Sequence, residues 1–243
     1  MDKQIENWYL HWFDSDFYPI LYEDRNHREA QEFMHNITGY LNLSPGAHIL
    51  DLACGRGRHS IYLNEMGYRV TGIDLSENAI THARKKENEN LRFLVHDMTE
   101  PMTENYDAVF NLFTSFGYFE KEESNLKTIK AIRQNLNVNG YGVIDFMNTQ
   151  KVLNNLIPEN EITRRGITFR LKRYVQDKYI YKEIRFEHQG QDYHFTERVR
   201  ALELEDFKQY FQTAGMNLLQ TFGDYQLNEF DRKDSDRLIM IFR

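Results

Sequence analysis

The sequence is poor in the residues on which several classes of protein depend. One cysteine among 243 residues can form neither an internal disulfide nor a multi-thiolate metal site, so we expect no metal and a reducing compartment. Four prolines and no internal repeat exclude collagen-like and solenoid proteins. No apolar run approaches the roughly 18 residues that a membrane helix needs. The first residues also lack the basic and apolar stretches of a signal peptide. We therefore expect a cytoplasmic protein without a membrane anchor.

Basic charge is scarce overall but concentrated in one segment. Lys and Arg total 30 against 37 Asp and Glu, a net charge of −7, which makes nucleic acid an unfavoured partner. Residues 162–200 nevertheless hold ten basic and five acidic residues, net +5, which leaves −12 for the remainder. This asymmetry marks the segment as a subdomain. Its charge fits either a solvated surface or a face that meets an anionic acceptor.

The middle of the chain alternates short apolar strands with amphipathic helices. This rhythm predicts a parallel sheet covered on both faces, with ligands beyond the carboxyl ends of its strands. A helix ended by Gly215 and an antiparallel hairpin return after residue 200. The predicted strands are 48–53, 68–75, 91–97, 106–113, 141–148, 217–225 and 237–242. The predicted helices are 57–66, 76–86 with Ser76 as N-cap, 122–136 and 204–214.

Two further regions flank this α/β core, which we assign to residues 44–150 and 201–243. Residues 1–43 combine an aromatic stretch with an amphipathic helix at 29–41, and we expect them to form a helical lid. Residues 151–200 are rich in β-branched and aromatic residues with turn signals at Gln176-Asp177 and Gln189-Gly190. They predict an inserted antiparallel β meander of three strands on the acceptor side of the site.

The sharpest motif is ILDLACGRGRHS, a strand that runs into a glycine-rich turn and then a helix. Gly55 and Gly57 would let the backbone approach a ligand closely. Dinucleotide-binding folds use a similar turn, but position 60, where their third glycine falls, is Ser60. Asp51 ends the strand just before the turn, where its charge would oppose a pyrophosphate and favour a cationic ligand.

The ends of the next three predicted strands also carry polar residues. Asp74, followed by Leu75, closes the second strand, where a carboxylate can accept both hydroxyl hydrogens of a ribose. Asp97 and Met98 end the third strand, where an acid can accept from an adenine amino group and a thioether can lie on the ring. The fourth strand ends in NLFTSFGYF, where Asn111 offers a polar contact and Phe113 a wall.

D-L-A-C-G-R-G, G-I-D-L-S and H-D-M, in this order and spacing, resemble the class I S-adenosylmethionine-dependent methyltransferases, small-molecule branch. The resemblance implies a Rossmann-like seven-stranded sheet, mostly parallel with an antiparallel last strand, and S-adenosyl-L-methionine as cofactor. It assigns the turn to the methionine part of the cofactor, with Ala53 tolerable where the family often has glycine if its φ is negative. The resemblance thus implies that ten residues contact the cofactor: Asp51, Ala53, Gly55, Gly57, Asp74, Leu75, Asp97, Met98, Asn111 and Phe113.

In this branch a tyrosine and an arginine near the N-terminus close over the cofactor. The residues here that match them are Tyr18, Tyr22 and Arg25, and the two tyrosines are also the candidates for a catalytic role. The surrounding aromatic residues fit the core of an N-terminal helix equally well. A nucleophilic role for Cys54 has no support beyond its position beside the turn. No sequence pattern identifies any of the histidines as a catalytic base; those considered are His11, His27, His59 and His194.

These observations predict methyl transfer to a small-molecule acceptor by in-line displacement. Nitrogen is the favoured acceptor atom, because an amine can arrive unprotonated whereas an oxygen needs a base that the sequence does not show. Three alternatives stay open: an NAD-dependent Rossmann oxidoreductase, an RNA-modifying methyltransferase that uses the basic insertion, and a cofactor sensor without turnover. Neither the acceptor nor the oligomeric state follows from the sequence.

Overall fold

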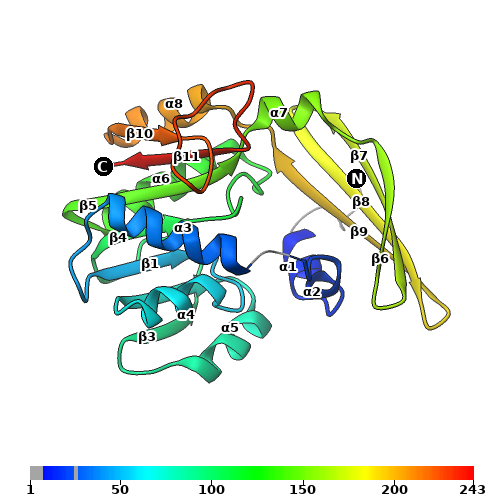
Figure 1. Ribbon diagram of the computed structural model, residues 1–243, viewed down its shortest axis with the longest axis horizontal. Coiled ribbons are helices and arrows are strands. Elements are labelled where there is room, and N and C mark those ends of the chain that lie inside the picture. Colours follow the sequence, from blue (N-terminus) through cyan, green and yellow to red (C-terminus); the bar gives the residue numbers. More distant parts are fainter. Residues whose placement is uncertain (1–7, 25–26) are drawn as a thin grey trace.

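A computed structural model describes residues 8–24 and 27–243 (Figure 1), and the side chains of Leu10 and His27 are not described. The helices are α1 Trp8–Phe13, α2 Tyr18–Leu21, α3 His27–Tyr40, α4 Arg58–Glu65, α5 Glu77–Ala83, α6 Glu122–Asn135, α7 Thr149–Asn154 and α8 Leu204–Ala214, with a 3₁₀ turn η1 at Arg84–Lys86. The strands are β1 His48–Leu52, β2 Arg69–Asp74, β3 Leu91–Val95, β4 Tyr106–Asn111, β5 Leu136–Met147, β6 Glu159–Arg164, β7 Ile167–Gln176, β8 Tyr179–His188, β9 Gln191–Arg200, β10 Leu218–Phe222 and β11 Arg237–Phe242.

Sheet A has seven strands in the order β10-β11-β5-β4-β1-β2-β3. Its strands are parallel except β11, which runs antiparallel to both β10 and β5. The predicted fold class is therefore confirmed, including the antiparallel last strand and the closing hairpin. This order places the carboxyl ends of β1, β2, β3 and β4 along one edge, where the sequence motifs lie.

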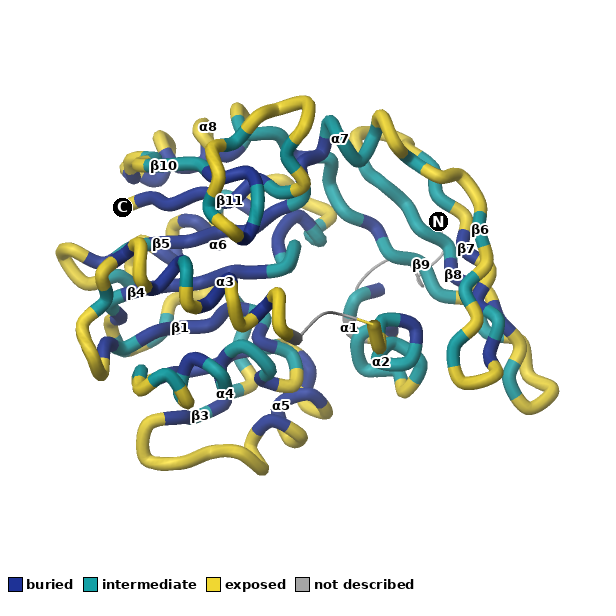
Figure 2. The backbone as a smooth tube through the Cα atoms, viewed as in Figure 1, coloured by how far each residue is buried: buried dark blue, intermediate teal, exposed yellow. Residues whose placement is uncertain are grey.

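Two hydrophobic layers cover sheet A, as the predicted helices require. On one face α3, α4 and α5 pack with side chains such as Ile49. On the other face α6 and α8 pack with side chains such as Leu50. Neighbouring strand residues thus serve opposite layers, so the strands are apolar on both faces. Figure 2 shows the central strands of sheet A, such as β1, β4 and β11, as mostly buried.

Residues between β5 and α8 form sheet B, a separate antiparallel sheet in the order β6-β7-β8-β9. The predicted insertion is confirmed, but it has four strands rather than three, because β6 was missed. Its hairpin turns Asp177-Lys178 and Gln189-Gly190 have positive φ at both central residues, the geometry of type I′ turns. The chain leaves and re-enters the core at adjacent points, where Thr149 Oγ1 donates to the Leu202 carbonyl at 2.5 Å.

The N-terminal residues divide between the two sheets. α1 and α2 pack on sheet B, with Trp8, Trp12 and Leu21 buried among its apolar side chains. α3, grouped with the lid in the sequence analysis, instead packs on sheet A through Phe33 and Ile37. In Figure 1, α1 and α2 lie between the two sheets, so this short segment borders the space that separates them.

Candidate functional site

The turn between β1 and α4 forms the floor of the candidate site. Its backbone has positive φ at Ala53, Gly55 and Gly57. A Cβ on Gly57 would lie 2.6 Å from the Phe93 ring, whereas a Cβ on Gly55 would meet nothing within 4 Å. Gly57 is therefore needed for packing, and Gly55 faces open space. Ala53 does not meet the condition of a negative φ under which alanine is tolerable at this position: its φ is 57°, which costs an alanine about 1–2 kcal/mol.

Asp51 lies beneath this turn and is only 2% exposed. The Ser60 hydroxyl, on the first turn of α4, donates to its carboxylate at 2.5 Å. Burial raises the pKa of Asp51 to about 7, although the Ser60 hydrogen bond opposes the rise. Asp51 and Ser60, two separate indications in the sequence, are therefore one buried pair that fixes the helix to the strand.

Asp74 connects the end of β2 to the glycine turn. Its carboxylate accepts the backbone N–H of Gly55 at 2.8 Å and that of Ser76 at 2.9 Å. Burial raises the pKa of Asp74. Each carboxylate oxygen has a second lone pair, so both can still accept from a ligand hydroxyl. Leu75, 36% exposed, follows Asp74 and offers an apolar surface beside it.

Asn111 at the end of β4 carries a polar atom that the protein does not satisfy. Its amide nitrogen donates to the Leu52 carbonyl at 3.3 Å and to the Met98 sulfur at 3.8 Å. Its Oδ1 is buried and, among the described residues, accepts no hydrogen bond. Asp97 accepts the Thr99 N–H at 2.8 Å, which is a turn contact. Asn111 Oδ1 lacks a donor, and the Asp97 carboxylate keeps lone pairs that could accept further hydrogen bonds. Both groups fit a ligand with many hydrogen-bond donors, such as one that has an ammonium group and ribose hydroxyls.

The loop after β4 has a strained backbone, and the buried ion pair between Asp145 and Arg237 holds it in place. Phe113 and Thr114 both have positive φ. The Phe113 N–H donates to the Asp145 carboxylate at 2.8 Å, and Arg237 Nε contacts the same carboxylate at 2.7 Å. Burial, followed by the Asp145 charge, raises the pKa of Tyr225, whose hydroxyl donates to Asp145. This network keeps Phe113 and Thr114 in a conformation that isolated residues avoid.

The segment containing α1 and α2 reaches the cofactor edge of sheet A. Asp14 accepts hydrogen bonds from the Ser76 hydroxyl and from Asn78 at the start of α5. Burial and the charge of Asp97 raise the pKa of Tyr9, so α1 is close to the end of β3. The sequence offered no signal for Asp14, because its partners lie more than 60 residues away.

The tyrosines singled out in the sequence lie toward sheet B. The Tyr22 hydroxyl donates to Glu197 Oε1 at 2.5 Å and accepts from Lys182 Nζ at 2.5 Å. Tyr18 packs edge-on against Trp12 within the aromatic cluster. Arg25 lies outside the described residues. Contacts of Tyr18, Tyr22 and Arg25 with a cofactor therefore stay predictions.

A cavity of about 410 Å³ lies between the two sheets. Arg58, Phe113 and Thr114 line it from the cofactor edge of sheet A, and its lining from sheet B includes Arg173, Lys182 and Glu197. Sequence motifs did not identify the sheet B residues, because they gather across strands and not along the chain. A substrate in this cavity would be in contact with both sheets.

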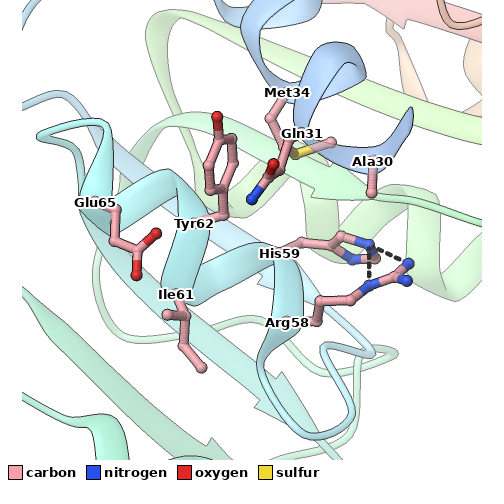
Figure 3. A pocket seen from close by; sticks show the side chains of 8 residues that line it. All are labelled: Ala30, Gln31, Met34, Arg58, His59, Ile61, Tyr62 and Glu65. Atoms are coloured by element: carbon pink, nitrogen blue, oxygen red, sulfur yellow. Dashed lines mark hydrogen bonds between the residues drawn. The ribbon is translucent and has the colours of Figure 1, made fainter. Parts of the chain in front are cut away.

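A second cavity, of about 100 Å³, lies between α3 and α4 (Figure 3). Arg58 and His59 point toward each other there, and Arg58 Nε donates to His59 Nε2 at 3.1 Å. The His59 ring stacks on Phe113 with a centroid distance of 4.4 Å. His59 thus supports the strained loop from the side of α4.

The remaining candidates in the sequence have unremarkable surroundings. Burial raises the pKa of the Cys54 thiol well above its usual value, which opposes a nucleophilic role. His11 is exposed, and His194 is half-exposed beside Glu183 at 3.9 Å. Among the described residues, no group of three or more His, Cys, Asp or Glu side chains is arranged to hold a metal ion.

None of the described helices combines the length and apolar character needed to cross a membrane.

Comparison with known proteins places the motifs within a described family. Residues 49–140 match a family described as a methyltransferase domain. The chain is 38% identical over 100 residues to the "Probable S-adenosyl-L-methionine-dependent methyltransferase TehB" of Haemophilus influenzae, a match over 40% of this chain and 34% of that protein. The chain therefore spans about a third of the length of that relative.

Solved structures resemble the whole fold. An S-adenosylmethionine-dependent methyltransferase from Clostridium acetobutylicum superposes with a TM-score of 0.80 at 18% identity, over 93% of this chain and 95% of that one. The sugar N-methyltransferase KedS8 of Streptoalloteichus superposes with a TM-score of 0.71 at 18% identity, over 92% of both chains. At these identities the likeness establishes the fold alone.

Proposed function

We propose that this chain, whose α/β core belongs to the class I S-adenosylmethionine-dependent methyltransferases, transfers a methyl group to a small molecule bound between sheets A and B. The observation that carries the proposal is the 410 Å³ cavity, because residues from the cofactor edge and from sheet B line the same space. A substrate held there would be adjacent to the glycine turn that the family uses for its cofactor.

The residues at the cofactor edge fit S-adenosyl-L-methionine. Gly55 opens onto empty space, Asp74 keeps lone pairs for ribose hydroxyls, and Asn111 Oδ1 needs a donor. We assign the adenine end to Leu75, Asp97 and Met98. When bound there, the cofactor supplies a methyl group on a sulfonium, which is already a good leaving group.

The residues of the protein would contribute mainly alignment and exclusion of water. Phe113 and Thr114 form one wall of the cavity, in a loop that Asp145 and Arg237 hold rigidly. The α1–α2 segment, joined to α5 through Asp14, covers the edge of the sheet. Positioning of two reactants in this way can lower a barrier by about 7–11 kcal/mol.

We infer that nitrogen is the preferred acceptor atom. No histidine is found among the described residues that line the cavity. The cavity lining holds two carboxylates, Glu29 on α3 and Glu197 on β9. Glu197, the one on the sheet B side, already accepts from Trp12 and Tyr22, so it is poorly placed to take a proton from an alcohol. An amine needs no dedicated base if it arrives unprotonated.

Calorimetric titration with S-adenosylhomocysteine tests the cofactor assignment. Asp74→Ala should weaken binding at least about tenfold, because the ribose contact and the link to Gly55 are both lost. Glu104→Gln, at a surface ion pair with Arg92, is the matched control and should bind as the native chain does. Thermal unfolding of each variant separates lost contacts from lost structure. Unchanged affinity in Asp74→Ala, or tight binding of NADH instead, would contradict the assignment.

Turnover is tested separately, by release of S-adenosylhomocysteine with libraries of amines, amino acids, amino sugars and matched alcohols. Release with at least one amine, and none with the alcohols, is the expected result. Cofactor binding without release for any acceptor would indicate a sensor and contradict methyl transfer. Retention on heparin at moderate salt would instead favour an RNA acceptor.

A further inference from the structure

The inner face of sheet B carries one charged row between apolar rows. Arg173 on β7 lies directly opposite Lys182 on β8, and Lys182 lies opposite Glu197 on β9. The next row toward the aromatic cluster is Leu171, Ile184 and Phe195, and the row on the other side is Val175, Ile180 and Val199. A charged row in such an apolar setting is costly unless its charges are matched.

Two cations lie directly opposite each other in this row, and among the described residues only one of them has a carboxylate partner. Lys182 Nζ lies 3.6 Å from Glu197 Oε2, and the two side chains are 16% and 17% exposed. Arg173 Nη1 donates only to neutral oxygens, those of Asn160 at 2.6 Å and the Ile157 carbonyl at 3.2 Å. Within the described part of the chain, no carboxylate lies within the 4.0 Å ion-pair distance of Arg173.

The outer face of the same sheet provides an internal comparison. Arg170 and Arg185 also lie directly opposite each other there. Each has its own acid, Glu161 at 3.1 Å and Glu183 at 2.9 Å, although the two arginines are 75% and 63% exposed. Like charges opposite each other destabilise a sheet. The sheet thus neutralises the pair that water already screens, whereas Arg173, on the face that lines the cavity, has no carboxylate partner among the described residues.

The unmatched cation faces the substrate space. Arg173, Lys182 and Glu197 all line the 410 Å³ cavity, whose opposite end is formed by Arg58, Phe113 and Thr114. Arg237, another cation of the lining, is matched by buried Asp145. An anion bound beside Arg173 would supply the charge partner that the described residues do not provide, in a cavity where charges interact more strongly than in bulk water.

We propose that Arg173, with Lys182 beside it, is an anion-binding subsite, and that the methyl acceptor is an amine that also carries a carboxylate or phosphate. The planar guanidinium suits either group, because it can donate two parallel hydrogen bonds. The anion would anchor one end of the acceptor on sheet B and turn its amine toward Phe113 and Thr114. This inference rests on the proposed function for the amine end, whereas the anion subsite stands on the cavity itself.

The first test measures anion binding without turnover. Inorganic phosphate and acetate are titrated separately into the protein saturated with S-adenosylhomocysteine, and the heat is recorded. The native chain should bind at least one of them, and Arg173→Gln should weaken that binding roughly ten- to a hundredfold, the loss typical of a contact with a charged group. Arg173→Lys should recover part of the loss. Arg170→Gln removes the same charge from the outer face of β7 and should bind as the native chain does.

The second test compares acceptors in matched pairs, an amino acid against its amide and an amino-sugar phosphate against the free amino sugar. The anionic member should have a kcat/KM at least about tenfold higher, and Arg173→Gln should raise KM for that member with little change in kcat. A preference within only one pair distinguishes carboxylate from phosphate. Equal rates within both pairs, or anion binding that Arg173→Gln leaves unchanged, would overturn the subsite. Loss of S-adenosylhomocysteine binding by the native chain would instead overturn the proposed function.

Discussion

At the scale of single residues, Asp51 makes stability depend on pH. Its pKa is about 7 in the folded chain against 3.8 as the reference value. Between these values the folded state holds a proton that the unfolded state has released, so stability falls as pH rises from about 4 to 7. The full shift corresponds to a loss on the order of 4 kcal/mol. The buried carboxylate is therefore retained at a cost to the apo fold.

Asp51→Asn should remove this cost. The amide oxygen can still accept the Ser60 hydroxyl hydrogen, but it carries no charge to desolvate. We expect the variant to exceed the native chain in free energy of unfolding by up to about 4 kcal/mol at pH 8, with the difference shrinking toward pH 4. Urea denaturation at several pH values measures it. Asp192→Asn, at an exposed hairpin position, controls for net charge. If the difference in free energy of unfolding did not change with pH, burial would not be what raises the pKa of Asp51.

At the scale of elements, the β1–α4 turn assigns different tasks to its two glycines. Gly57→Ala should destabilise the chain by about 2–5 kcal/mol, because its Cβ would strike Phe93 and its φ is 81°. Gly55→Ala should cost only about 1 kcal/mol in stability yet weaken S-adenosylhomocysteine binding, because the new methyl group would fill the open space. Urea denaturation and calorimetry measure the two effects. If Gly55→Ala bound S-adenosylhomocysteine as tightly as the native chain, the placement of the cofactor at this turn would be contradicted.

Elements with a strong periodic pattern could be predicted from the sequence, and weakly patterned ones could not. The core helices and the strands of sheet A agree with prediction to within a few residues, apart from the start of β5. The predicted start at 141 was too late: β5 begins at Leu136, and its residues 137–139 are exposed, so they lack the buried apolar pattern that marks the rest of the strand. β6 was missed because alternate residues of this edge strand are exposed and only Ile162 is a large apolar residue. α7 has six residues, too few for a helical period.

The candidate site shows the same division. The residues of the glycine turn and Asp74 could be predicted because each follows a strand within a short motif, and parallel strands bring their ends together. Asp14, Arg173 and Glu197 could not, because their neighbours in space are far along the chain. Only the register of sheet B places Arg173 beside Lys182.

At the scale of the whole molecule, the protein has two packed bodies of unequal size. The layers of sheet A extend through most of the chain, whereas the cluster on sheet B is small. Both tryptophans of the sequence, Trp8 and Trp12, are buried in the smaller cluster, at 4% and 0% exposure. Tryptophan fluorescence therefore reports on that body alone.

We expect two distinguishable transitions in urea. Fluorescence should shift to the red at a lower midpoint than the loss of far-ultraviolet circular dichroism, because the smaller cluster buries less apolar surface. Saturating S-adenosylhomocysteine should raise the circular dichroism midpoint, since a ligand of the native state stabilises it. Coincident midpoints from the two signals would show one cooperative unit.

The bond between Thr149 and the Leu202 carbonyl has an evolutionary consequence. It ties together the two points where the inserted sheet joins the core. The insertion is therefore attached to the core at one place and could be exchanged as a single unit. Recombination that replaced everything between these points would leave the strands and turn of the catalytic half untouched. New substrate ranges could then arise by swapping one block of sequence, without any need to re-evolve how the methyl donor is held.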